Sequence, residues 1–216
     1  MDTEEREKNG KASPISNLTS LNKDGSLIRA NKLQEDSKEH TKCVSMVEKS
    51  CAKGMYVKVL LDGLKKLGCD TGLDTKNICC EPCEPRLTAA FDTDRKEVIV
   101  CENQMRNQKF MDNVLTHELI HAYDVCRAKF DQKNLEHLAC SSIRVANLTG
   151  DCFFWKENFL RLRFGWKAQH QECVRELAVK NMMCSKDISE QKARGVVDKV
   201  FDSCFNDHEP FPRIPP

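Results

Sequence analysis

The sequence predicts an α+β fold, with a small N-terminal part of helix and β-hairpin followed by a mostly helical part stapled by disulfide bonds. Three observations support this prediction. Apolar residues recur at helical spacing in several segments, and two short extended runs flank a polar turn. Thirteen cysteines are spread along the 216 residues. A chain of this length holds one domain of ordinary size, with or without a tail.

The chain divides into an arm and a domain. Residues 1–40 are rich in Lys, Glu, Asp, Ser and Asn, so we expect a disordered polar N-terminal arm and a domain over residues 41–216. Apolar residues recur at helical spacing from Cys43 to Leu67, and Gly68 is a natural helix end. "AAFDTDRKEVIVCEN" predicts a hairpin. Helices are predicted over 111–130, 135–148, 152–164, 168–183 and 187–205, the last one capped by Asp187 and Glu190.

The cysteines favour an oxidising compartment, because a reducing cytosol has little use for so many dispersed thiols. The odd count leaves at least one cysteine free, metal-bound or paired between chains; the alternative is a fully reduced protein. The N-terminus is acidic and polar, with no secretory signal, and no stretch approaches the ~18–20 apolar residues that span a bilayer. The mitochondrial intermembrane space reconciles these features. A net charge of +1 gives no electrostatic case for binding nucleic acid.

The segment "NVLTHELIHAYD", residues 113–124, carries two histidines four positions apart, with a glutamate directly after the first. Positions i and i+4 of a helix share a face, so His117 and His121 can donate two imidazole nitrogens to one Zn²⁺ ion. Glu118 lies beside the ion, where it can take a proton from water. The pattern predicts one catalytic zinc ion in a zincin-like metalloprotease; the alternative is a helix with two surface histidines.

A catalytic zinc site needs a third protein ligand. His137 follows His121 by sixteen residues, which allows a turn and an antiparallel return, so we expect it to be that ligand. Asp124 shares the ligand face and can fix the tautomer of a ligand imidazole. The alternative for His137 is a structural histidine, and the alternative for Asp124 is a solvated surface acid.

Zinc peptidases usually bind substrate along an edge strand, and "EVIVCEN", just before the metal helix, is the candidate edge. The oxyanion donor has no clear candidate, and Tyr123, Arg144 and His170 are proposed without geometry.

With these residues in hand, the chain resembles the mitochondrial inner-membrane metalloprotease family linked to ATP synthase assembly. The resemblance extends from Cys43 to the C-terminus and is carried by "YVKVLLDGLKKLGC", "FDTDRKEVIVCEN", "VLTHELIHAYD", "HLACSSIRVANLTGDC", "HQECVREL" and "VFDSCFNDHEPFPRIPP". It implies a disulfide-rich protein of the intermembrane space, peripheral on the inner membrane and without a cleavable presequence. It also implies an ATP synthase membrane subunit precursor as substrate, and a role in ATP synthase assembly.

The same resemblance makes His117 and His121 zinc ligands and Glu118 the catalytic acid and base. It alone implies a Ku-type DNA-repair partner. One departure stands out, because Ser142 occupies a position where the family typically has glutamate. If that glutamate is the family's third zinc ligand, this chain has lost the ligand. If His137 is the third ligand, the serine at position 142 means only that a carboxylate behind the ligands is missing. Arg144 is a further candidate for a residue that supports the ligands from behind. Cys51, Cys79 and Cys184 are additional to the usual family cysteines.

Two alternatives to a protease remain open. In the first, the chain is a non-proteolytic assembly factor or chaperone that retains a vestigial zinc site. In the second, Cys79, Cys80 and Cys83 belong to a structural zinc knuckle used in partner binding.

Overall fold

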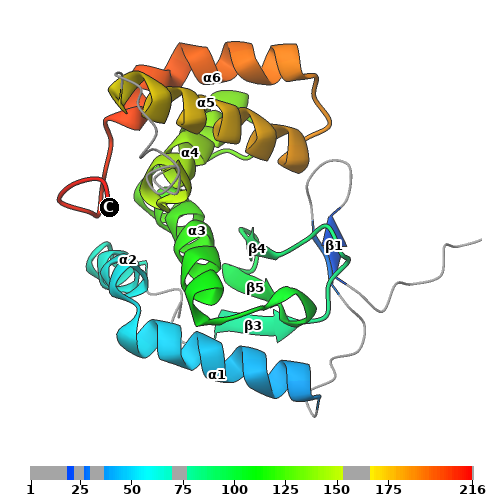
Figure 1. Ribbon diagram of the computed structural model, residues 1–216. Helices are drawn as coiled ribbons and strands as arrows, with labels where there is room; N and C mark the ends of the chain where they lie inside the picture. The colour runs from blue at the N-terminus through cyan, green and yellow to red at the C-terminus, as the bar shows by residue number, and fades with distance from the viewer. Residues whose placement is uncertain (1–18, 22–26, 30–36, 70–76, 153–165, 216) are drawn as a thin grey trace, which may run out of the picture.

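The computed structural model describes residues 19–21, 27–29, 37–69, 77–152 and 166–215, and mixes helix and sheet as predicted (Figure 1). A small sheet and helices α1 and α2 form one part, and α4, α5 and α6 form another. The long helix α3 runs between the two parts, so both contribute to its surroundings.

The main sheet has three strands in the order β3-β5-β4. β5 (Glu97–Cys101) pairs in parallel with β3 (Ile78–Glu81) and antiparallel with β4 (Ala89–Asp92). The prediction that "EVIVCEN" forms an edge is therefore wrong, because β5 is the central strand. Four consecutive residues, Val98 to Cys101, are completely buried, as in a strand covered on both faces. β4 is the edge beside α3.

The predicted hairpin is confirmed as β4 and β5. Its turn is held by the side chain of Asp92, whose Oδ1 accepts hydrogen bonds from the backbone N–H groups of Asp94 and Arg95, each at 3.0 Å. Lys96 closes the turn with a φ of 57°. Asp at the first position of a turn satisfies the backbone donors that follow it, so the polar sequence and the turn agree.

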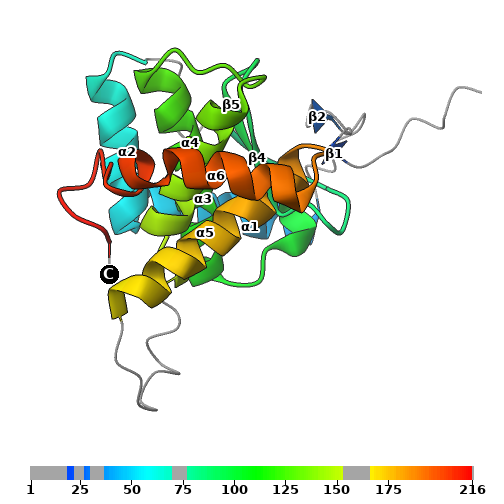
Figure 2. The same ribbon diagram turned by 90° about the horizontal axis from the view of Figure 1, so that it is seen from above.

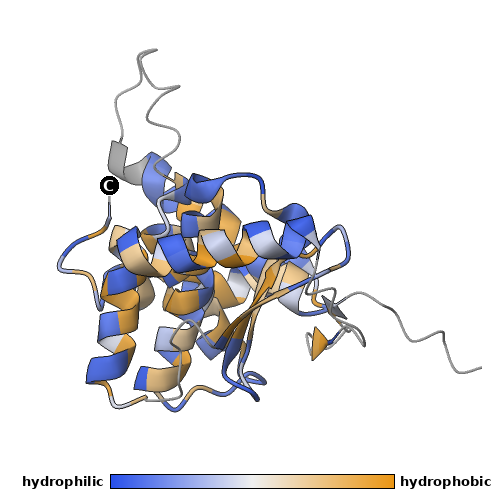
Figure 3. Ribbon diagram, turned by 90° about the horizontal axis from the view of Figure 1, so that it is seen from below, coloured by the Kyte–Doolittle hydropathy of each residue, from blue (hydrophilic) through white to orange (hydrophobic). Residues whose placement is uncertain are grey.

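The first hydrophobic core lies between the sheet and helices α1 (Lys38–Lys53), α2 (Met55–Lys66) and α3 (Gln108–Arg127). A short 3₁₀ helix, η2 (Glu102–Gln104), joins the sheet to α3. Figure 3 shows hydrophobic residues concentrated on the strands and on the inner faces of these helices.

The second core is formed by α4 (Leu135–Leu148), α5 (Trp166–Ser185) and α6 (Glu190–Phe205), and Figure 2 shows α5 and α6 side by side. Helix α4 serves both cores. Its Ile143 packs against α5 and α6, whereas Val145 and Leu148 belong to the first core.

Most helix predictions are confirmed, with ends shifted by a few residues; α4 has the predicted bounds. The predicted helix 152–164 lies, from residue 153 on, outside the described residues. The predicted cap at Asp187 is wrong, because α6 begins at Glu190 and its cap is Ser189, whose side chain accepts from the Lys192 backbone N–H.

The structure describes residues 19–21 and 27–29 of the predicted N-terminal arm. β1 (Ser20–Leu21) and β2 (Leu27–Ile28) pair with each other, and Arg29 forms ion pairs with Glu81 and Glu97 of the main sheet. Glu81 is 1% exposed, so Arg29 supplies the charge that its burial requires. The predicted boundary at residue 40 also falls inside α1.

Five disulfide bonds staple the domain: Cys43–Cys80, Cys69–Cys126, Cys83–Cys101, Cys140–Cys204 and Cys152–Cys173. Cys51, Cys79 and Cys184 are free, and these are the three cysteines identified above as additional. The zinc-knuckle hypothesis is wrong, because Cys80 and Cys83 are both in disulfides. Within the described ranges, no helix is both long enough and apolar enough to cross a bilayer.

This pairing predicts the thiol count. Protein denatured without reductant should react with three equivalents of Ellman's reagent, and with thirteen after full reduction, because only Cys51, Cys79 and Cys184 are unpaired. A variant with these three changed to serine is the control and should show none. Thirteen thiols without reductant would contradict the disulfide framework.

Candidate metal centre

The histidine pair lies in the middle of α3. Asn107 caps the helix by accepting a hydrogen bond from the Phe110 backbone N–H at 3.0 Å. The predicted apolar stripe is confirmed, since Leu115 and Leu119 are fully buried and Ala122 is 2% exposed. This stripe anchors α3 in the first core and thereby fixes which way its polar face points.

His117 and His121 lie one helical turn apart on that polar face, with ring centroids 5.1 Å apart and the rings inclined by 62°. Burial lowers the pKa of His117 to about 4, against the opposing charge of Asp151. Burial also lowers the pKa of His121 to about 3, with a smaller contribution from the charge of His117. Both rings are therefore neutral at physiological pH, which is the form in which imidazole binds a metal.

Glu118 is buried beside the pair, with an exposed fraction of 8%. Burial raises the pKa of its carboxyl to about 8, and a backbone hydrogen bond from Phe91 of β4 opposes the rise. The backbone of Thr88 faces β5, since its carbonyl accepts a hydrogen bond from the Cys101 N–H. Backbone groups alternate in direction along a strand, so the N–H of Phe91, three positions later, points away from β5. The Glu118 side chain therefore reaches the edge of β4 that faces away from β5.

Helix α4 contacts the pair through Ser141. The Ser141 hydroxyl lies 2.8 Å from Nδ1 of His121 and donates a hydrogen bond to Oδ2 of Asp124 at 2.9 Å. The sequence predicts a direct bond between a ligand imidazole and Asp124; in the structure Ser141 lies between His121 and Asp124 and bonds to both. We call His121, Ser141 and Asp124 the relay.

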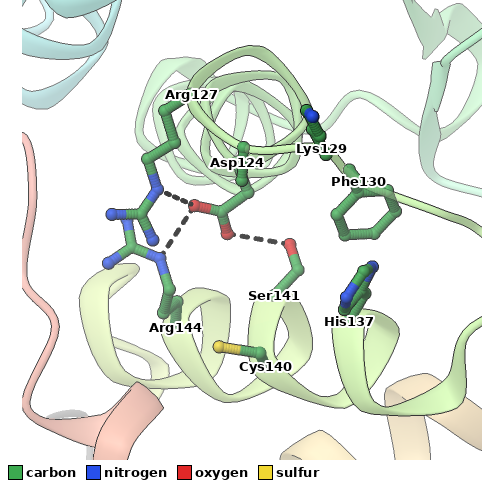
Figure 4. Close-up of a pocket in the computed structure, with 9 residues that line it drawn as sticks. Asp124, Arg127, Lys129, Phe130, His137, Cys140, Ser141 and Arg144 are labelled. Carbon is green, nitrogen blue, oxygen red and sulfur yellow. Dashed lines mark hydrogen bonds and ion pairs between the residues drawn. The ribbon is translucent and has the colours of Figure 1, made fainter.

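Two arginines hold Asp124 from the other side (Figure 4). Its Oδ1 accepts from Nε of Arg144 at 2.8 Å and from Nε of Arg127 at 3.1 Å. Arg144, whose side chain is 1% exposed, also donates to the backbone carbonyls of Asp207 and Glu209 and pairs with the Asp207 carboxylate. The C-terminal segment is therefore bound to the relay through Arg144.

The surrounding charges favour the ionised form of Asp124. Burial raises the pKa of its carboxyl, and Arg144 and Arg127 oppose that rise. A guanidinium keeps its proton at any physiological pH, so protonating Asp124 would deprive the buried Arg144 of one of its two carboxylate partners.

His137 occupies a different place from the one predicted. Its Nδ1 accepts a hydrogen bond from the Asp131 backbone N–H at 3.1 Å, and its ring faces Phe130 across a small pocket at the start of α4 (Figure 4). Within the described part of the chain, no three His, Cys, Asp or Glu side chains lie close enough to share a metal ion. The structure therefore does not bring His137 to the histidine pair, where the sequence predicts it to lie.

The other predicted residues have separate contacts. Ser142 is buried on α4 directly after Ser141. Tyr123 packs in the first core, and His170 contacts the side chain of Asn147 at 2.8 Å. Together with the engagement of Arg144 by carboxylates and carbonyls, this leaves no residue that we assign as an oxyanion donor.

Sequence reasoning missed two residues of the site. Ser141 lies four residues after His137, on the same face of the predicted helix, and this spacing is the sequence signal for it. Asp151, which follows α4, lies close enough to His117 for its charge to oppose the lowering of the pKa of that imidazole by burial. The sequence signal for Asp151 is its position directly after Gly150, at the end of the α4 segment.

Comparison with known proteins decides the family. The family model described as the peptidase M76 family matches residues 41–212. This chain belongs to that family. The family expected from the resemblance is therefore confirmed, and membership of a peptidase family supports peptidase activity.

Relatives in this family carry a consistent name. A human protein named mitochondrial inner membrane protease ATP23 homolog is 46% identical over 175 residues, covering 81% of this chain and 70% of that protein. A Schizosaccharomyces pombe protein named mitochondrial inner membrane protease atp23 is 34% identical over 186 residues, covering 84% of this chain and 97% of that protein. No solved structure matches the chain.

The buried charges behind the relay predict a stability effect. Arg144→Ala should lower the free energy of unfolding by about 3 kcal/mol, because buried Asp124 keeps only Arg127 and Ser141 as partners and the carbonyls of Asp207 and Glu209 lose their Arg144 donor. Urea denaturation measures the change. Lys199→Ala, which removes an ion pair to Glu136 at the surface, is the control and should cost less than about 1 kcal/mol. Equal losses would contradict a buried network.

Proposed function

We propose that this chain is a zinc endopeptidase of the mitochondrial intermembrane space that cuts a precursor associated with the inner membrane. The observation that carries the proposal is the arrangement on α3, where Glu118 directly follows His117, beside the histidine pair, and reaches the edge of β4 that faces away from β5. Membership of a peptidase family and the names of the relatives support it. The zincin-like architecture is part of the proposal.

The residues present fit a zinc ion in part. Two neutral imidazoles on successive turns of one helix are the donor pair that Zn²⁺ requires, so His117 and His121 would hold the ion. A bound zinc ion supplies Lewis acidity, which polarises the scissile carbonyl and makes water a stronger acid. The third protein ligand is not assigned by the described residues.

Glu118 is the proton carrier in this proposal. Its carboxylate takes a proton from the attacking water and delivers it to the leaving amine. A cation held by the neighbouring histidines would lower the pKa of the Glu118 carboxyl from its buried value and restore the basic form. A substrate added to the free edge of β4 would lie against Phe91, whose N–H already reaches Glu118.

The substrate class rests on the family resemblance. Its implied substrate is the precursor of an ATP synthase membrane subunit, with the enzyme peripheral on the inner membrane. The names of the relatives include the mitochondrial inner membrane and protease activity, and we propose that this chain acts at the same membrane.

Glu118→Gln tests the chemistry. We expect cleavage of the precursor to be lost while one zinc ion per chain is retained, because the amide keeps the shape of the side chain but cannot accept a proton. Precursor processing is followed by gel mobility, and zinc by atomic emission spectroscopy. Glu172→Gln, at an exposed position on α5, is the control. A wild-type protein that holds no zinc and cuts no precursor would refute the proposal.

Two substitutions address the third ligand. We expect His137→Ala to leave zinc binding unchanged, because His137 is engaged by Asp131 in a separate pocket. Ser142→Glu should tighten zinc binding by about tenfold or more, since it restores the family's carboxylate next to Ser141. Competition with a chelating dye measures both affinities. Loss of zinc from His137→Ala would show that His137 moves to the pair when metal binds.

A second candidate is a non-proteolytic assembly factor that binds nascent ATP synthase subunits. Ser142 favours it, because the described residues bring no third acid or histidine to the pair. ATP synthase assembly in cells expressing Glu118→Gln separates the two functions. Assembly that persists without cleavage would assign this role to the chain in addition to, or in place of, proteolysis.

A further inference from the structure

Ser141 has one hydroxyl hydrogen and two neighbours within hydrogen-bond distance. Nδ1 of His121 lies 2.8 Å from its oxygen and Oδ2 of Asp124 lies 2.9 Å away. The residue is 2% exposed, so bulk water does not compete for these contacts. The hydroxyl can donate to only one neighbour and must accept from the other.

The charge on Asp124 decides the direction. An ionised carboxylate can only accept, and Arg144 and Arg127 stabilise the ionised form. Ser141 therefore donates to Asp124 and accepts from His121. A neutral imidazole carries one ring hydrogen, so a hydrogen on Nδ1 leaves a lone pair on Nε2.

We propose that Ser141 is a positioning residue which, backed by Asp124, holds His121 as the Nδ1–H tautomer and keeps its Nε2 lone pair available for a metal ion. The use of that lone pair rests on the proposed zinc site, whereas the choice of tautomer does not. The relay explains why a buried carboxylate with two arginine partners lies behind the histidine pair. It also gives the C-terminal segment a role, because Asp207 and Glu209 hold Arg144.

The alternative is that Ser141 only joins α3 to α4. A matched control separates the two. Ser50 is a fully buried serine of α1 whose hydroxyl donates to Asp112 of α3, so Ser50→Ala removes a helix-to-helix contact of the same kind away from the histidines. Ser141→Thr keeps the hydroxyl and is the conservative variant.

The tautomer is read in the metal-free full chain by long-range ¹H–¹⁵N correlation of the His121 ring at neutral pH. Wild type, Ser50→Ala and Ser141→Thr should show Nδ1–H alone, and Ser141→Ala should show Nε2–H in substantial amount. Asp124→Asn should invert the tautomer, because the new amide N–H donates to Ser141, which then donates its own hydrogen to Nδ1. A single Nδ1–H state in both Ser141→Ala and Asp124→Asn would overturn the proposal.

Zinc affinity is the second readout. Dye competition should show a loss of about 10–100-fold in Ser141→Ala, as for other residues that orient a ligand, and no loss in Ser50→Ala or Ser141→Thr. Equal affinities of wild type and Ser141→Ala would overturn the link to metal binding. A wild type without zinc would refute the proposed function, while the tautomer measurement would still decide the role of Ser141.

Discussion

The buried ion pair between Asp124 and Arg144 is the interaction on which the site depends. It connects α3, which carries the histidines, to α4 and, through the carbonyls of Asp207 and Glu209, to the C-terminal segment. Removing one partner of a buried pair is costly, because the other charge is left in a medium of low polarity. The register of α3 against α4 is thereby tied to the orientation of His121.

The rest of the fold gives this interaction a rigid setting. Helix α4 shares side chains with both hydrophobic cores, so it cannot shift without disturbing either. A disulfide joins α4 to α6 through Cys140 and Cys204, and Cys69–Cys126 ties the end of α3 to the segment after α2. Packing fixes the positions of the helices, and the ion pair fixes the position of Asp124 between them. Through Ser141, Asp124 then orients the imidazole of His121.

The sequence predicted what depends on local spacing. The helix with His117, Glu118 and His121, the bounds of α4 and the hairpin follow from periodicity and turn chemistry. Strand β3 was missed because cysteines and nearby turn residues hide a short strand whose pairing with β5 is non-local. Ser141 and the place of His137 depend on how α3 and α4 pack, and spacing along the chain does not encode that contact.

Anomalous diffraction at the zinc edge, from crystals of the metal-loaded protein, would locate a zinc ion held by the histidine pair on α3. We expect one peak about 2.0–2.1 Å from Nε2 of His121 and at a similar distance from a ring nitrogen of His117. A peak at Cys51, Cys79 or Cys184, with none at the histidine pair, would contradict this expectation.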